Sequence, residues 1–137
     1  MILEFEGKKP QIHHSVRIFD NVSIIGDVSI DEDSSVWFGS VIRGDLNAIK
    51  IGKRTNIQDL VIIHTLQQGD GTFPNGLPTI VGVDCTIGHR VTLHACKIGN
   101  HCLIGMGSVV LDNAIVGDDC FITAGSVLLK NKKYPPM

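Results

Sequence analysis

The sequence predicts an all-β fold built as a solenoid of short stacked strands, and a repeat of six residues carries this prediction. Ile, Val or Leu recurs every sixth position, with three changes of phase, which follow Ile42, Ile63 and Leu93. An amphipathic helix has a period of about 3.6 residues and does not fit this pattern. The anchor positions are Ile12, Ile18, Ile24, Ile30, Val36, Ile42, Ile51, Ile57, Ile63, Val81, Ile87, Leu93, Ile98, Ile104, Val110, Val116, Ile122 and Leu128.

Two further regularities support the solenoid. A small or slender residue, such as Ser34, Cys85 or Ser108, follows most anchors by four positions. Glycine often follows an anchor directly, as in Ile98-Gly99. Six residues suit a short strand plus a corner, so three hexads close one triangular coil whose interior the anchors fill. Successive coils then rise by about 4.8 Å, the spacing of paired strands, and glycine eases the tight corners.

The repeat runs from residue 12 to about residue 129 and predicts one β-helix domain over residues 1–137. The segment 66–80, "LQQGDGTFPNGLPTI", interrupts it. This segment is rich in turn-forming residues, so we expect a loop extruded at a corner of the solenoid.

Composition excludes several classes of function. The net charge of −2 gives no basic surface for nucleic acid or an anionic membrane. The N-terminus has no signal-peptide pattern, and no stretch is long and apolar enough to span a membrane. The four cysteines lack C-x-x-C spacing, so we expect small buried residues in a cytoplasmic protein.

The register of the repeat places the histidines. We name the three sides of a coil faces A, B and C, with Ile42 on A, Ile51 on B and Ile57 on C. With the loop set aside, Ile63 and Leu93 also fall on face A, so the residues that follow the face-A anchors point outward in one column. These residues are Arg43, His64 and His94.

His64 and His94 should therefore lie about 4.8 Å apart, close enough to share a metal ion. His89 falls on face C with Gln58, near a corner, and cannot join them within one subunit. Face C of a neighbouring subunit could supply it. The register thus predicts metal sites shared between subunits, as a cyclic trimer would provide.

A set of motifs in order resembles the γ-class carbonic anhydrases and their close bacterial homologues. The set comprises "RGD" at 43–45, "NIQD" at 56–59, His64, and the pair His89 and His94 separated by four residues. The resemblance implies a left-handed parallel β-helix and a homotrimer with metal sites between subunits. It implies that His64, His89 and His94 hold Zn²⁺, with Fe²⁺ or Co²⁺ as alternatives.

The resemblance also assigns the other motif residues. Arg43 and Asp45 tie neighbouring subunits together, Asn56 and Gln58 lie beside the metal water, and Asp59 supports this site. Other interpretations stay open, since Arg43 and Asp45 could form a surface ion pair and Asn56 a turn.

The implied reaction is reversible hydration of CO₂ to bicarbonate by metal-bound hydroxide. The chain departs from active members of the family in carrying Leu46 where they carry Glu, and the 66–80 loop offers only Asp70 as an acid. A weak activity is expected without these proton-transfer groups. The C-terminal helix that usually follows the last coil is missing from this chain. Two alternatives remain, a hexapeptide-repeat acyl- or acetyltransferase that uses CoA and a non-catalytic metal-binding assembly protein.

Overall fold

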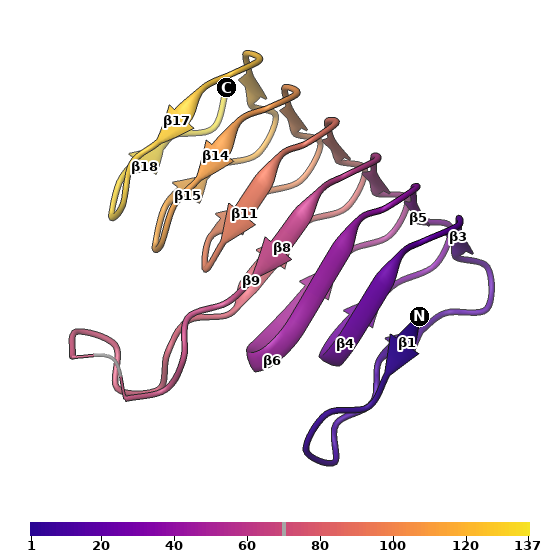
Figure 1. The fold of residues 1–137 in the computed structure, drawn as a ribbon. Helices are drawn as coiled ribbons and strands as arrows, with labels where there is room; N and C mark the ends of the chain where they lie inside the picture. Colours follow the sequence, from indigo (N-terminus) through magenta and orange to yellow (C-terminus); the bar gives the residue numbers. More distant parts are fainter. Residues whose placement is uncertain (70) are drawn as a thin grey trace.

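A computed structural model describes residues 1–69 and 71–137, which form eighteen strands, most of them two or three residues long, and no helix. The chain winds into parallel coils stacked along one axis, the architecture of a left-handed β-helix (Figure 1). No helix in this described part of the chain could cross a membrane. The all-β solenoid predicted from the six-residue repeat is confirmed.

The strands divide among the three faces of the coil. Face A carries β1 (Ile2–Leu3), β8 (Ile62–His64), β11 (Thr92–His94), β14 (Val109–Val110) and β17 (Val127–Leu128). Face B carries β2 (Gln11–Ile12), β9 (Thr79–Val81), β12 (Lys97–Ile98), β15 (Ile115–Val116) and β18 (Lys133–Tyr134). Face C carries β3 (Arg17–Ile18), β5 (Ser35–Val36), β7 (Asn56–Ile57), β10 (Thr86–Ile87), β13 (Leu103–Ile104) and β16 (Phe121–Ile122).

Two long strands, β4 (Ser23–Ile30) and β6 (Val41–Ile51), bend from face A onto face B. Faces A and B therefore form one sheet of twelve strands, whereas face C is a separate sheet of six.

Strand pairing confirms the register predicted from the sequence. Ile63 pairs with Ile42 on one side and with Leu93 on the other, and Ile57 pairs with Ile87. Fifteen of the eighteen anchors are buried in one continuous core, where removal of aliphatic surface from water stabilises the fold. The three others, Ile12, Ile18 and Ile122, are partly buried and pack against this core.

Glycine has a different role at the corners from the one expected. The left-handed backbone conformation falls mostly on other residues, as at Arg54 (φ 53°) and Asp84 (φ 55°). Gly52 is required by close approach instead, because a Cβ there would lie 2.6 Å from the carbonyl oxygen of Gly82 in the next coil. The Ile-Gly pairs therefore mark places where coils touch.

The slender positions link the coils by hydrogen bonds. The hydroxyl of Ser34 donates to the carbonyl of Gly52 at 2.8 Å, and that of Thr55 donates to Gly82 at 2.8 Å. The thiol of Cys85 donates to the carbonyl of Gly99 at 3.0 Å, so the same type of bond is repeated one coil further along. The four cysteines are free and buried, so they act as small core residues.

The interruption in the repeat leaves the solenoid between β8 and β9 and projects from a corner (Figure 1). Its base is closed by two backbone hydrogen bonds between Leu66 and Leu77, of 3.0 and 3.2 Å. Asp70, the acid noted in this loop, lies outside the described residues.

Candidate metal centre

His64 and His94 end two adjacent strands of face A and pair directly with each other in register. Nδ1 of His64 lies 3.2 Å from Nε2 of His94, and the ring centroids are 5.2 Å apart. The fixed spacing of paired strands thus brings the two imidazoles together.

Each of these two imidazole rings lies within hydrogen-bonding distance of a carboxylate. Oδ1 of Asp45 lies 2.9 Å from Nε2 of His64, and Oδ1 of Asp112 lies 2.5 Å from Nδ1 of His94. A neutral imidazole has one N–H, so a ring that donates it to a carboxylate keeps a lone pair on its other nitrogen. The two nitrogens that face each other then both carry lone pairs, an arrangement that a shared cation stabilises. The donor set therefore fits a metal ion.

Burial keeps His64 in the form that binds metal. Its side chain is 16% exposed, and this burial lowers the pKa of His64, although the hydrogen bond to Asp45 acts in the opposite direction. Burial raises the pKa of Asp45, but hydrogen bonds from His64 and Arg43 outweigh this and leave that pKa below its usual value. Nη1 of Arg43 lies 2.7 Å from Oδ2 of Asp45, so this ion pair forms within one chain.

The other predicted site residues lie on face C and at the corner that follows it. Nδ1 of His89 is 2.9 Å from Oδ1 of Asp59, and the His89 side chain is 48% exposed. A hydrogen bond from its own backbone, and then the bond from His89, lower the pKa of Asp59. Gln58 and His89 line a cavity of about 310 Å³ whose wall includes Met106 and Phe121.

Asn56 also belongs to this group. Its side-chain Oδ1 is buried and has no hydrogen-bond partner among the described residues. Buried polar atoms are almost always paired, so this oxygen is an exception among the described residues.

The structure therefore places these side chains in two separate groups within one chain, which we name the face-A half-site and the face-C half-site after the prediction. The face-A half-site comprises His64, His94, Asp45 and Asp112, and the face-C half-site comprises Asn56, Gln58, Asp59 and His89. In residues 1–69 and 71–137, no group of three or more His, Cys, Asp or Glu side chains is placed to hold one metal ion.

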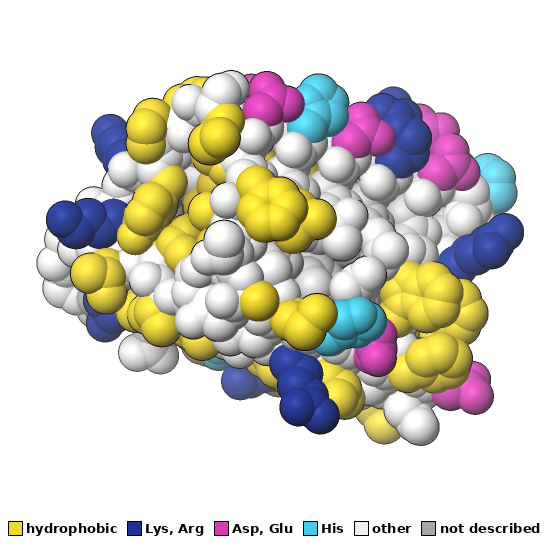
Figure 2. Space-filling model, turned by 90° about the horizontal axis from the view of Figure 1, so that it is seen from above, with side chains coloured by type: hydrophobic (Ala, Val, Ile, Leu, Met, Phe, Trp, Pro, Cys, Tyr) yellow, Lys and Arg dark blue, Asp and Glu magenta, His cyan; other side chains and the backbone are white. Residues whose placement is uncertain are grey.

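Exposed hydrophobic side chains lie around the two half-sites. Figure 2 looks down on the corner where face C passes into face A, and shows yellow hydrophobic side chains spread among cyan histidines that have magenta acids beside them. The exposed hydrophobic residues of this corner and its two flanks are Phe38, Leu60, Ile62, Met106, Phe121, Val127 and Leu129.

Comparison with known proteins decides the family. A putative acetyltransferase of known structure from Bacillus cereus is 46% identical, with a TM-score of 0.90 over 98% of this chain and 74% of that one. A carbonic anhydrase from Geobacillus kaustophilus is 46% identical over 114 residues, which are 83% of this chain and 58% of that protein. The chain belongs to the γ-carbonic-anhydrase-like hexapeptide-repeat proteins.

Other matches agree with this family. The model for the bacterial transferase hexapeptide (six repeats) matches residues 95–130, and that for the hexapeptide repeat of succinyl-transferase matches residues 78–111. Protein YrdA of Escherichia coli is 48% identical over 103 residues, which are 75% of this chain and 55% of that protein. The chain thus spans little more than half the length of YrdA and of the Geobacillus protein.

Asp112 is the one member of the half-sites to which sequence reasoning gives no role. It precedes the left-handed Asn113 at a corner, where an Asp is most simply read as a turn residue. The phase change after Leu93 is the signal that could have found it, because this change shortens the corner next to His94.

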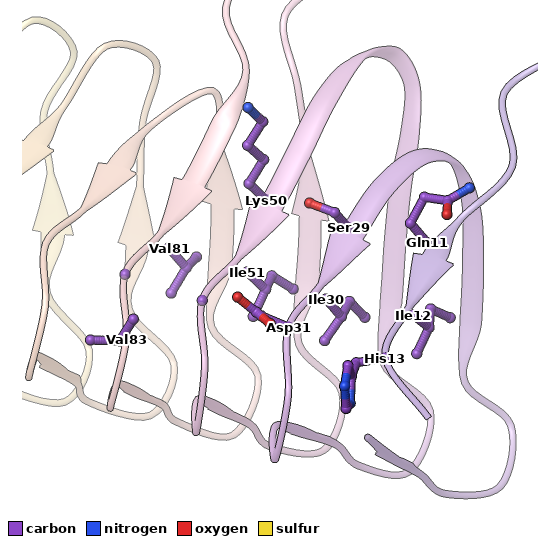
Figure 3. Close-up of a pocket in the computed structure, with 12 residues that line it drawn as sticks. Gln11, Ile12, His13, Ser29, Ile30, Asp31, Lys50, Ile51, Val81 and Val83 are labelled. Carbon is purple, nitrogen blue, oxygen red and sulfur yellow. The ribbon is translucent and has the colours of Figure 1, made fainter. Parts of the chain in front are cut away.

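A second concave site lies away from both half-sites. It is a groove of about 620 Å³ along face B, lined by residues of β2, β4, β6 and β9 and of the corners that follow them. Figure 3 shows Ile12, Ile30, Ile51 and Val81 in one row on successive strands, with Lys50 directed away from Ile51. Asp31 and His13 lie at the corner end of this groove.

Proposed function

We propose that this chain is a metal-dependent carbonic anhydrase-like protein that hydrates CO₂ reversibly to bicarbonate. The observation that carries the proposal is the 3.2 Å approach of two imidazole nitrogens from His64 and His94, each ring being backed by a carboxylate. A relative that is 46% identical and named a carbonic anhydrase supports the same reaction.

The ligands in this proposal are His64 and His94 of one copy and His89 of a second copy. Zn²⁺ held by neutral imidazoles, or Fe²⁺ or Co²⁺ in its place, supplies a Lewis acid that lowers the pKa of water to about 7. Asp45, Asp112 and Asp59 each accept a hydrogen bond from one of these three rings and so orient it.

In this proposal the amide side chains of the face-C half-site position the reactants. We assign Asn56, whose amide oxygen is buried and has no hydrogen-bond partner in the described chain, to a place beside the reacting water. Gln58 lines the cavity beside His89, where its amide can orient CO₂ or the attacking oxygen.

The partner is a second and a third copy of the chain. A homotrimer would bring the face-A half-site of one copy against the face-C half-site of the next, three times around a closed ring. The exposed hydrophobic residues at this corner, such as Leu60, Met106 and Phe121, suit burial between subunits. We assign Arg43 and Asp45 to the same interface.

The activity in this proposal is weak. Hydration releases a proton, which a nearby carboxylate or histidine must carry away at high turnover. Leu46, 39% exposed, follows Asp45 and offers no such group.

We also place the protein in the cytoplasm, where four free buried thiols stay reduced.

The test is stopped-flow CO₂ hydration on anaerobically purified protein, with metal content measured on the same sample. We expect about one metal per chain and measurable hydration. His94→Ala should lose both, whereas His101→Ala, which removes a histidine from a different corner, should keep both. Bound metal with background hydration would leave the non-catalytic assembly protein as the function. Absence of metal from the wild type would contradict the proposal.

One observation favours a second candidate, an acyl- or acetyltransferase that uses CoA. The face-B groove, with Lys50 and His13 in its lining, has room for an extended ligand. The relative from Bacillus cereus is also named a putative acetyltransferase. Calorimetric titration of the protein with CoA tests this candidate. Binding that is weakened in Lys50→Ala would support the transferase function, and absence of binding would exclude it.

A further inference from the structure

We propose that Asp112 is a positioning residue that fixes the tautomer of His94 and thereby leaves a lone pair on Nε2, the nitrogen that faces His64. The inference deepens the proposed function and rests on it for the role of the metal, but the tautomer can be measured without metal.

A shortened corner explains how Asp112 reaches His94. After β14, the chain passes through Leu111 and Asp112 before the left-handed Asn113 (φ 60°). After β11, the left-handed Ala95 (φ 51°) follows His94 directly, so this coil has one residue fewer at the corner. Asn113 donates its backbone N–H to the carbonyl of Ala95 at 2.8 Å, which aligns the two corners. Asp112 therefore has no counterpart beneath it, and its carboxylate reaches the ring of His94.

The contact determines where the ring proton lies. An ionised carboxylate can only accept, so Nδ1 of His94 must donate, and Nε2 keeps its lone pair toward His64. The side chain of Asp112 is 18% exposed, and the shielding from water strengthens this bond. Without Asp112, the proton can move to Nε2 and block the nitrogen that faces His64.

Asp112 is a cleaner subject for this test than Asp45. The carboxylate of Asp45 binds both His64 and Arg43, so its removal also breaks an ion pair. In the described part of the chain, the side chain of Asp112 bonds only to His94.

The experiment compares the wild type with Asp112→Ala and Asp112→Asn. The Asn variant keeps an acceptor oxygen of similar size, so it should restore most of what Ala loses. Asp20→Ala is the matched control, because Asp20 is an exposed carboxylate on another coil. Thermal unfolding of every variant identifies any loss of fold.

Two readouts are taken. Histidine side-chain ¹⁵N NMR on metal-free protein should show His94 as the Nδ1–H tautomer in the wild type and the Asn variant, and a shift toward Nε2–H in Asp112→Ala. Competition of Zn²⁺ with a chelator should show an affinity about 10- to 100-fold weaker for Asp112→Ala than for the wild type, with a smaller loss for Asp112→Asn.

The readouts separate this inference from the proposed function. If the wild type binds no Zn²⁺, the proposed function fails, and the tautomer of His94 alone decides the role of Asp112. An unchanged tautomer in a folded Asp112→Ala protein overturns the inference even if metal binds. Equal Zn²⁺ affinity of the wild type and Asp112→Ala overturns it as well.

Discussion

The backbone leaves His64 and His94 little freedom to separate, because both occupy the same position on neighbouring coils. One outward histidine on such a surface says little, whereas two in register give a pair of nitrogens 3.2 Å apart. Their positions could be derived from the six-residue period once the 66–80 loop was set aside. The acids behind them could not be derived in the same way, because Asp112 reaches His94 only through a difference in corner length.

The reactivity of the four cysteines tests the placement of single residues in the core. Burial raises the pKa of Cys96 to about 12 and that of Cys102 to about 11. Both thiols are then protonated at pH 8, and the thiolate is the form that reacts. We expect Ellman's reagent to label the native protein slowly and to react with all four cysteines in denaturant. Rapid labelling of the native protein would contradict their placement in the core.

The positions of the corners could be predicted from the sequence, whereas their backbone conformations are seen only in the structure. The Ile-Gly pairs could be read as corners, but the reason for glycine could not, since it depends on the neighbouring coil. Gly, Asn and Asp take most of the left-handed positions in the described residues, as local propensity predicts, but Arg54, Leu60 and Ala95 adopt the same conformation without such a sign. Local propensity was therefore a partial guide here, while periodicity was a good one.

Replacement of Gly52 tests the close approach of coils. Gly52→Ala would put a Cβ within 3 Å of backbone atoms of Gly82 and Val83, so the two coils must move apart. We expect a loss of about 1–3 kcal/mol in the free energy of unfolding, the usual cost of overpacking. Urea denaturation measures it.

Gly71→Ala is the matched control, because nothing lies within 4 Å of a Cβ there. Equal stability of the two variants would show that the coils at Gly52 are farther apart than described.

The whole molecule presents its two half-sites on different faces, and one chain cannot bring them together. The sequence predicted this separation from the register of His89 relative to His64. The association of subunits follows from the resemblance and from the exposed hydrophobic corner, and it stays a prediction. The contact of Arg43 with Asp45 lies within one chain, and whether the pair also reaches a neighbour depends on that assembly.

A charge at the hydrophobic corner should disrupt the assembly. Met106 is 58% exposed beside His89, and Met106→Glu would place a carboxylate in the proposed interface, where burial of a charge is costly. Light scattering after size exclusion should show smaller particles, and metal content should fall in parallel. Lys97→Glu, on face B, should leave both unchanged. A Met106→Glu trimer with full metal content would contradict the proposed interface.

The most direct test of a site shared between copies is to mix two inactive variants. His94→Ala lacks a working face-A half-site and His89→Ala lacks a working face-C half-site, so neither should bind metal alone. Equal amounts of the two variants, unfolded together and refolded, should regain about a quarter of the wild-type metal sites. About three quarters of the randomly assembled rings are mixed, and each mixed ring contains one intact junction of three. No metal in the mixture, while wild-type protein treated in the same way recovers its metal, would contradict the shared site.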